Sequence, residues 1–186
     1  MTQDLQQTVA LLRHTPGTLD ALLRDLPEGW PQRNEGEGTW TAFDVVGHLV
    51  YCERTDWMTR ARLILSNRNS PDGEVPAFRP VDRLGQKRES EGKSLAQLLD
   101  EFSRLRTENL AELESFQLTE SEFGLKGLHP AFGPVTLSQL LATWAVHDLT
   151  HLHQLSRILA YQYREAVGPW SAYLGVLQCN GHSAPA

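Results

Sequence analysis

The residues of this sequence best suited to chemistry are three histidines. His147 and His151 are four residues apart, so on one helix their imidazoles would project from adjacent turns and could converge on a single ion. His48 is the only other histidine on an apolar helical stripe, and a second helix of a bundle could bring it to the same ion. The pattern predicts a divalent metal held by three histidine nitrogens, with open positions opposite. Partly buried histidines bonded to neighbours or water are the alternative interpretation.

Several residues near these histidines are candidates for supporting roles. Glu53, Asp148 and Gln154 could orient the metal ligands or handle protons, although each could instead be an exposed or helix-capping residue. Cys52, one turn after His48, could face the same cleft or be a small buried hydrophobic residue. The sequence leaves these alternatives open.

Candidates for substrate contacts lie in the loops. The connection over residues 67–93 is long, polar and rich in Pro and Gly, and such a loop is usually functional or disordered. If it is ordered, its Phe78 and Arg79 could cover a cleft, and an inert crossover is the alternative. His129, on another loop, could line a cleft. His153 is expected to point away from the other histidines, because two residues turn a helix by about 200°.

Two catalytic motifs resemble the segment from His147 to His151. It is similar to the zinc-peptidase pattern H-E-x-x-H with Asp148 as the base. However, Asp is one methylene shorter than Glu, and Glu165 is the only acid downstream. The His-Asp pair also resembles the HD phosphohydrolases, but these need a further Asp ligand and none follows Asp148. Serine-hydrolase, P-loop and dinucleotide-binding motifs are absent, so nucleotide chemistry has no support.

Four segments have the hydrophobic period of amphipathic helices, over residues of about 2–26, 42–66, 95–116 and 137–166. Pro16 and Gly17 should kink or restart the first of them. A short fifth helix is expected over 169–180, with Pro169 in its first turn. Three of the four long segments begin with the spacing of a capping box, at Thr41/Asp44, Ser94/Gln97 and Thr136/Gln139.

Helices of roughly 22 to 30 residues can bury their apolar stripes only against one another, which predicts an all-α four-helix bundle. Strand signals are limited to a short stretch around 128–135 that prolines interrupt. The chain of 186 residues has the length of one domain. We therefore expect a single domain over 1–186, with a long crossover loop at 67–93 and a short C-terminal helix.

The composition excludes several classes of function. There are 17 Lys and Arg against 23 Asp and Glu, giving a net charge of −6, which leaves no basic surface for nucleic acid. No apolar run approaches the ~18 residues of a membrane span, and the first residues lack the pattern of an export signal. Cys52 and Cys179 form neither a disulfide framework nor a C-x-x-C metal motif. We expect a cytoplasmic protein with no nucleic-acid or membrane partner.

Three groups of residues together carry a resemblance to a known family. They are Trp40 ahead of Gly47-His48-Leu49 with Glu53 after it, Gly133-Pro134-Val135-Thr136-Leu137 leading into His147-Asp148-Leu149-Thr150-His151-Leu152-His153-Gln154, and the closing Gly168-Pro169-Trp170. Over nearly the whole chain the sequence resembles the DinB/YfiT-like superfamily of metal-binding four-helix bundles. The most specific element is one His on the second helix with H-x3-H-x2-Q on the fourth, which His48, His147, His151 and Gln154 match.

The resemblance implies a divalent ion, commonly Zn²⁺ or Ni²⁺, held by His48, His147 and His151 with water in the open positions, and frequent homodimers. It does not imply one reaction, because relatives include hydrolases and S-transferases or isomerases that use low-molecular-weight thiols. We therefore expect a metal-dependent enzyme of the hydrolase or thiol-dependent transferase type, acting on a small molecule. A non-catalytic, stress-associated metal-binding bundle and a metal-free ligand-binding bundle are the alternatives. Structural zinc normally has four protein ligands, and only three are counted here.

Overall fold

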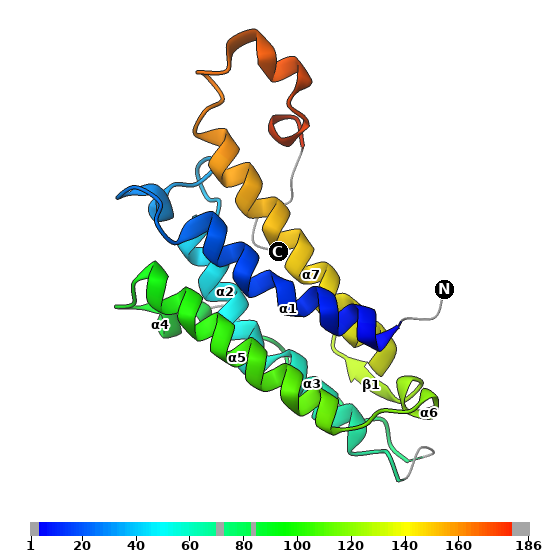
Figure 1. The fold of residues 1–186 in the computed structure, drawn as a ribbon. Helices are drawn as coiled ribbons and strands as arrows, with labels where there is room; N and C mark the ends of the chain where they lie inside the picture. The colour runs from blue at the N-terminus through cyan, green and yellow to red at the C-terminus, as the bar shows by residue number, and fades with distance from the viewer. Residues whose placement is uncertain (1–3, 70–72, 83–84, 180–186) are drawn as a thin grey trace.

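The computed structural model describes residues 4–69, 73–82 and 85–179 and shows a four-helix bundle, which confirms the predicted fold (Figure 1). The long helices are α1 (Leu5–Leu23), α2 (Ala42–Thr55), α5 (Leu95–Ser115) and α7 (Leu137–Tyr161). Helix α1 packs on α5 and α7, and α2 packs on α5 and α7. Short helix α6 (Glu120–Phe123) follows α5.

Helix capping explains where the long helices begin. Thr41, Ser94 and Thr136 each accept a hydrogen bond from the backbone N–H three residues on, and the side chain at that position bonds back to the cap residue's N–H. These are the three predicted capping boxes. Helix α1 begins after Asp4, whose carboxylate accepts hydrogen bonds from amides of the first turn. A short 3-10 helix, η1 (Trp30–Gln32), lies in the connection between α1 and α2.

The first two helices differ in extent from the sequence prediction. Helix α1 passes through Pro16 without restarting, and buried Leu12 and Leu19 on either side hold it in the core. It ends at Leu23 instead of residue 26. The segment predicted as one helix over 42–66 is divided at Asp56, whose φ of −111° and ψ of −76° depart from helical values. Helix α3 (Trp57–Leu65) follows this break.

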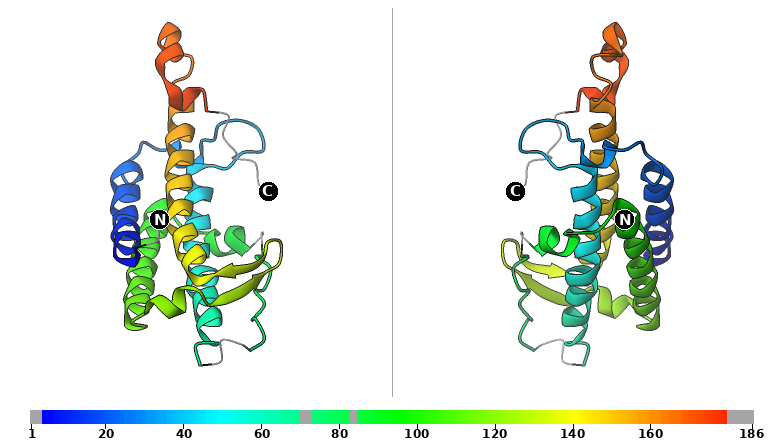
Figure 2. Two further views of the ribbon diagram at one scale, coloured as in Figure 1. Left: turned by 90° about the vertical axis from the view of Figure 1, so that its right-hand side faces the viewer. Right: turned by 90° about the vertical axis from the view of Figure 1, so that its left-hand side faces the viewer.

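The crossover over residues 67–93 contains a short helix, α4 (Gly85–Ser90), while residues 70–72 and 83–84 lie outside the described part of the chain. Strand β1 (Lys126–His129) pairs with β2 (Gly133–Thr136) in an antiparallel hairpin, where the short strand signal is predicted. Ala77 of the crossover forms an isolated parallel bridge with Leu128 of β1. Figure 2 shows the hairpin and α4 on the side of α2 and α7 that faces away from α1 and α5.

The end of the described chain winds more tightly than the predicted helices. Helix α7 ends at Tyr161 rather than at residue 166. Two 3-10 helices, η2 (Gly168–Tyr173) and η3 (Gly175–Leu177), take the place of the short helix predicted over 169–180, whose last residue lies outside the described part. The three residues of η3 are a usual length for 3-10 winding, whereas the six of η2 are longer than most such runs. The segment projects beyond the end of the bundle (Figure 1).

The core consists of two hydrophobic clusters. One includes Trp57, Met58 and Trp144, and the other includes Phe102 and Ile158. Both draw on the apolar stripes of the long helices, and the first also includes residues of α3 and Phe78 of the crossover. Among the described residues, no helix is long and apolar enough to cross a membrane.

Candidate metal centre

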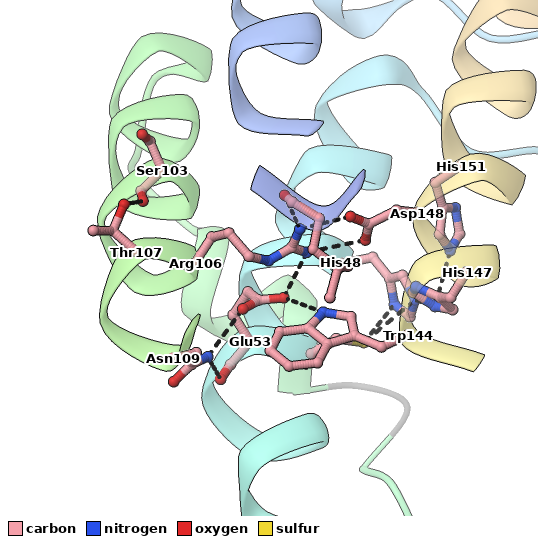
Figure 3. Close-up of polar contacts among 12 residues, drawn as sticks. His48, Glu53, Ser103, Arg106, Thr107, Asn109, Trp144, His147, Asp148 and His151 are labelled. Carbon is pink, nitrogen blue, oxygen red and sulfur yellow. Dashed lines mark hydrogen bonds and ion pairs between the residues drawn. The ribbon is translucent and has the colours of Figure 1, made fainter. Parts of the chain in front are cut away.

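Three histidine rings meet between α2 and α7 (Figure 3). The Nε2 atom of His48 lies 3.1 Å from Nε2 of His147, and Nε2 of His151 lies 3.2 Å from the same atom. The spacing of His147 and His151 puts both rings on one face of α7, and α2 brings His48 to meet them. The centroids of the three ring pairs are 4.4 to 5.2 Å apart. His153 is exposed, as expected for a residue pointing away from the other histidines.

Two glutamines determine which ring nitrogens carry protons. His48 Nδ1 donates to Gln86 Oε1 and His151 Nδ1 donates to Gln154 Oε1, each over 2.8 Å. Because a neutral imidazole has one N–H, Nε2 of both rings carries a free lone pair. His147 Nε2 can donate a proton to only one of them, and its Nδ1 is buried with no hydrogen-bond partner among the described residues. A divalent cation suits this converging donor set better than hydrogen bonds do.

Burial keeps the three rings neutral. Burial, and to a lesser degree the nearby His151, lowers the pKa of His48 from 6.5 to about 4. Burial lowers the pKa of His147 further, to about 2, and positive charge on the neighbouring histidines and Arg106 adds to the effect. The pKa of His151 is also lowered by burial. All three rings are therefore in the neutral form that metal binding requires.

Gln86 reaches the histidine cluster because α4 packs very close to α2. A Cβ atom at Gly47 would lie 2.4 Å from the hydroxyl oxygen of Ser90, and one at Gly85 would lie 2.3 Å from the Tyr51 hydroxyl oxygen. A larger residue at either glycine would force the Ser90 hydroxyl or the Tyr51 ring to move. Gln86 was not among the sequence candidates, because it lies in a segment whose polar, turn-rich composition indicates a loop.

Cys52 joins the cluster from α2. Its Sγ atom lies 3.5 Å from Nε2 and 4.0 Å from Nδ1 of His48. One potential ligand atom from each of His48, Cys52 and His147 lies within 4.8 Å of the other two, so these residues could hold a metal ion. The thiol is 3% exposed, and its pKa is raised by burial first and by the nearby carboxylates of Asp56 and Glu53. Cys52 is thus both buried and at the histidine cluster.

A buried ionic cluster lies next to the histidines (Figure 3). Arg106 of α5 donates to both carboxylate oxygens of Asp148, over 2.6 and 3.0 Å. It also donates to Glu53 Oε1 and to the backbone carbonyl of Leu12, each over 2.8 Å. The three charged side chains are each 1% exposed. Burial opposes the charge of Arg106, but the two carboxylates outweigh it and raise the pKa of the guanidinium.

The expected supporting residues therefore divide into two groups. Gln154 accepts a hydrogen bond from His151, one of the three candidate metal ligands. Glu53 and Asp148 are buried but bind Arg106, and Glu53 also accepts hydrogen bonds from Trp144 Nε1 and from Asn109. Arg106 was not among the sequence candidates. Its spacing of four residues from both Phe102 and Leu110 on the apolar stripe of α5 is the signal that places it in the core.

The loop residues predicted to contact a substrate have their neighbours outside the histidine cluster. Phe78 is buried under the hairpin, where its ring lies 2.3 Å from the position of a Cβ at Gly127, so it fills the core instead of covering a cleft over the histidines. Arg79 is exposed and lines a cavity of about 400 Å³ beside α3. His129 stacks on Phe132 with ring centroids 4.5 Å apart.

Known proteins share this sequence pattern and this fold. Residues 11–155 match the model of the DinB superfamily. The structure of YfiT from Bacillus subtilis, described as a probable metal-dependent hydrolase with an unusual four-helix bundle topology, is similar with a TM-score of 0.67 and 23% identity over 87% of each chain. TT2238, a four-helix bundle protein, is similar with a TM-score of 0.50 and 21% identity over 82% of this chain and 98% of its own. No curated protein matches this chain.

Proposed function

Because this chain belongs to the DinB superfamily, we propose that it is a metal-dependent enzyme whose ion is held by His48, His147 and His151. The approach of two Nε2 atoms to that of His147, over 3.1 Å from His48 and 3.2 Å from His151, is the observation that carries this proposal. The description of YfiT, which has the same fold, as a probable metal-dependent hydrolase supports it.

A divalent ion bound there, Zn²⁺ or Ni²⁺, would supply Lewis acidity that lowers the pKa of a water or a small thiol toward neutrality. The residues of the chain prepare the site for it. Gln86 and Gln154 hold protons on Nδ1 of two rings and so leave the Nε2 atoms next to His147 Nε2 with free lone pairs. His48 and His147 are half-buried, so the cluster is not sealed from small molecules. This arrangement suits a hydrolase that activates water or a transferase that activates a low-molecular-weight thiol.

The nearby carboxylates are not available as general bases. Every carboxylate oxygen of Glu53 and Asp148 accepts a hydrogen bond, and both side chains bind Arg106. This arrangement counts against the zinc-peptidase interpretation, in which Asp148 would take a proton from water. The two carboxylates stabilise the helices that carry the histidines instead.

Elemental analysis by plasma mass spectrometry tests the metal site. Untagged wild-type protein is expected to contain about one equivalent of zinc or nickel. The His147→Ala/His151→Ala double variant should lose it, and the exposed matched control His153→Ala should retain it. Wild-type protein that binds neither Zn²⁺ nor Ni²⁺ after incubation and removal of the excess would contradict the proposal.

Activity assays on metal-loaded and metal-free protein test the enzyme. Metal-dependent cleavage of chromogenic esters or amides would identify a hydrolase. Metal-dependent conjugation of a small thiol to an electrophile would identify a transferase. A protein that binds metal but catalyses neither reaction would be a non-catalytic metal-binding bundle, and the proposed enzyme would be wrong.

A further inference from the structure

Cys52 lies at the histidine cluster but has no role in the proposed function. Its sulfur is 3.5 Å from His48 Nε2, and a potential ligand atom of His147 is also within 4.8 Å of the group. The side chain is 3% exposed, so packing rather than free rotation in solvent determines where the sulfur lies. The sulfur is therefore held beside the histidine nitrogens by the packing of the protein.

Three of the separations among these donor atoms are close to the edges of a zinc coordination tetrahedron; they join Cys52 to His48, His48 to His147 and His147 to His151. Bonds of ~2.0–2.1 Å from zinc to nitrogen and ~2.3 Å to sulfur give edges of roughly 3.3 Å between two nitrogens and roughly 3.6 Å between nitrogen and sulfur. The observed distances are 3.1 and 3.2 Å between histidine nitrogens and 3.5 Å from Cys52 Sγ to His48 Nε2. The sulfur therefore lies close enough to share an ion with the histidines.

We propose that Cys52 also binds the ion, as a thiolate beside His48 and His147, the two histidines with which it could hold a metal ion. This inference rests on the proposed function, because it requires the histidines to bind the ion. On binding, the S–H bond breaks, its proton passes to the solvent and the sulfur lone pair forms the new bond, with no oxidation or reduction. A thiolate ligand favours zinc over magnesium or manganese.

Cobalt(II) distinguishes a sulfur ligand from the other ligands. Co²⁺ is added to the metal-free protein, and the visible d–d bands report binding while a near-ultraviolet charge-transfer band reports a thiolate ligand. The wild-type protein is expected to show both. Cys52→Ser should retain the visible bands and lose the charge-transfer band. Cys179→Ser, which changes the exposed cysteine, should retain both and is the matched control.

The outcomes separate this inference from the proposed function. Visible bands without a charge-transfer band in the wild type would overturn the role of Cys52 and leave the histidine site intact, and so would a charge-transfer band that persists in Cys52→Ser. The absence of all bands in folded wild-type protein would overturn both proposals.

The test does not depend on one variant folding. The chain has only two cysteines, so a charge-transfer band that persists in Cys179→Ser must come from Cys52. As a second readout, Zn²⁺ binding should release more protons from the wild type than from Cys52→Ala, measured with a pH indicator in weak buffer. Equal proton release from the two would contradict the inference.

Discussion

At the scale of single residues, the pKa shifts of the histidines link the site to folding. Burial lowers the pKa to about 4 for His48 and to about 2 for His147. In the unfolded chain both rings return to a pKa of about 6.5. Between these values the unfolded state binds more protons than the folded state, so the free energy of unfolding falls as the pH falls.

We expect the metal-free protein to lose stability as the pH drops from about 6.5 towards 4, by up to about 1.4 kcal/mol per pH unit for each histidine. The contribution of the histidines to the free energy of unfolding keeps its full value at pH values above about 6.5, their pKa in the unfolded chain. Urea unfolding at a series of pH values measures it. His147→Phe removes the most strongly shifted group and should flatten the pH dependence, whereas His153→Ala should leave it unchanged. Equal slopes for wild type and His147→Phe would contradict this account.

Residue spacing predicted which histidines meet but not what surrounds them. The positions of His147 and His151 on one helical face follow from the helical period alone. The partners of Arg106 could not be predicted in this way, because a buried arginine requires carboxylates from two other helices to arrive at the same place. Its spacing on the apolar stripe was a signal, but only the tertiary fold shows that Glu53 and Asp148 meet it there.

At the scale of helices, the starts were more predictable than the breaks. The three capping boxes use hydrogen bonds within four residues, so the sequence contains all of their information. The break at Asp56 is not marked by Pro or Gly in the sequence around it. Helix α4 is only six residues long and lies in a segment of loop-like composition, so its contact with α2 comes from tertiary packing.

Helix α4 also allows a test of how the site is supported. Gln86→Ala should weaken Zn²⁺ binding about 10–100-fold, because His48 loses the acceptor that fixes its ring. Competition with a chromophoric chelator measures the affinity. Lys87→Ala changes the exposed neighbour on the same helix and should have no effect. Unchanged affinity in Gln86→Ala would mean that the ring of His48 is oriented without α4.

At the scale of the whole molecule, Arg106 connects the four long helices. It belongs to α5 and bonds to the Leu12 carbonyl of α1, Glu53 of α2 and Asp148 of α7. Its guanidinium also lies 4.8 Å from the ring centroid of Phe102 and 5.1 Å from that of Trp144, which belong to different hydrophobic clusters. The two helices that carry the histidines are therefore held in register by one buried cation.

Arg106→Met is expected to destabilise the protein by about 3–5 kcal/mol, because it leaves two buried carboxylates without their cation. Urea unfolding at neutral pH measures the loss. Arg104→Met, at an exposed position on the same helix, should change stability by no more than about 0.5 kcal/mol. Adding Glu53→Gln and Asp148→Asn to Arg106→Met should recover part of the loss. A cost of less than about 1 kcal/mol for Arg106→Met would mean that the cluster contributes no more than a surface ion pair.

The histidines that meet between α2 and α7 come from distant parts of the chain, since His48 and His147 are 99 residues apart. In an unfolded chain, an ion that gathered the same nitrogens would have to close a loop of that length, at an entropic cost of about 4–5 kcal/mol. The folded bundle already holds them side by side, so an ion would bind the folded chain in preference to the unfolded one. A chelator would then shift the folding equilibrium of this protein without ever touching the polypeptide.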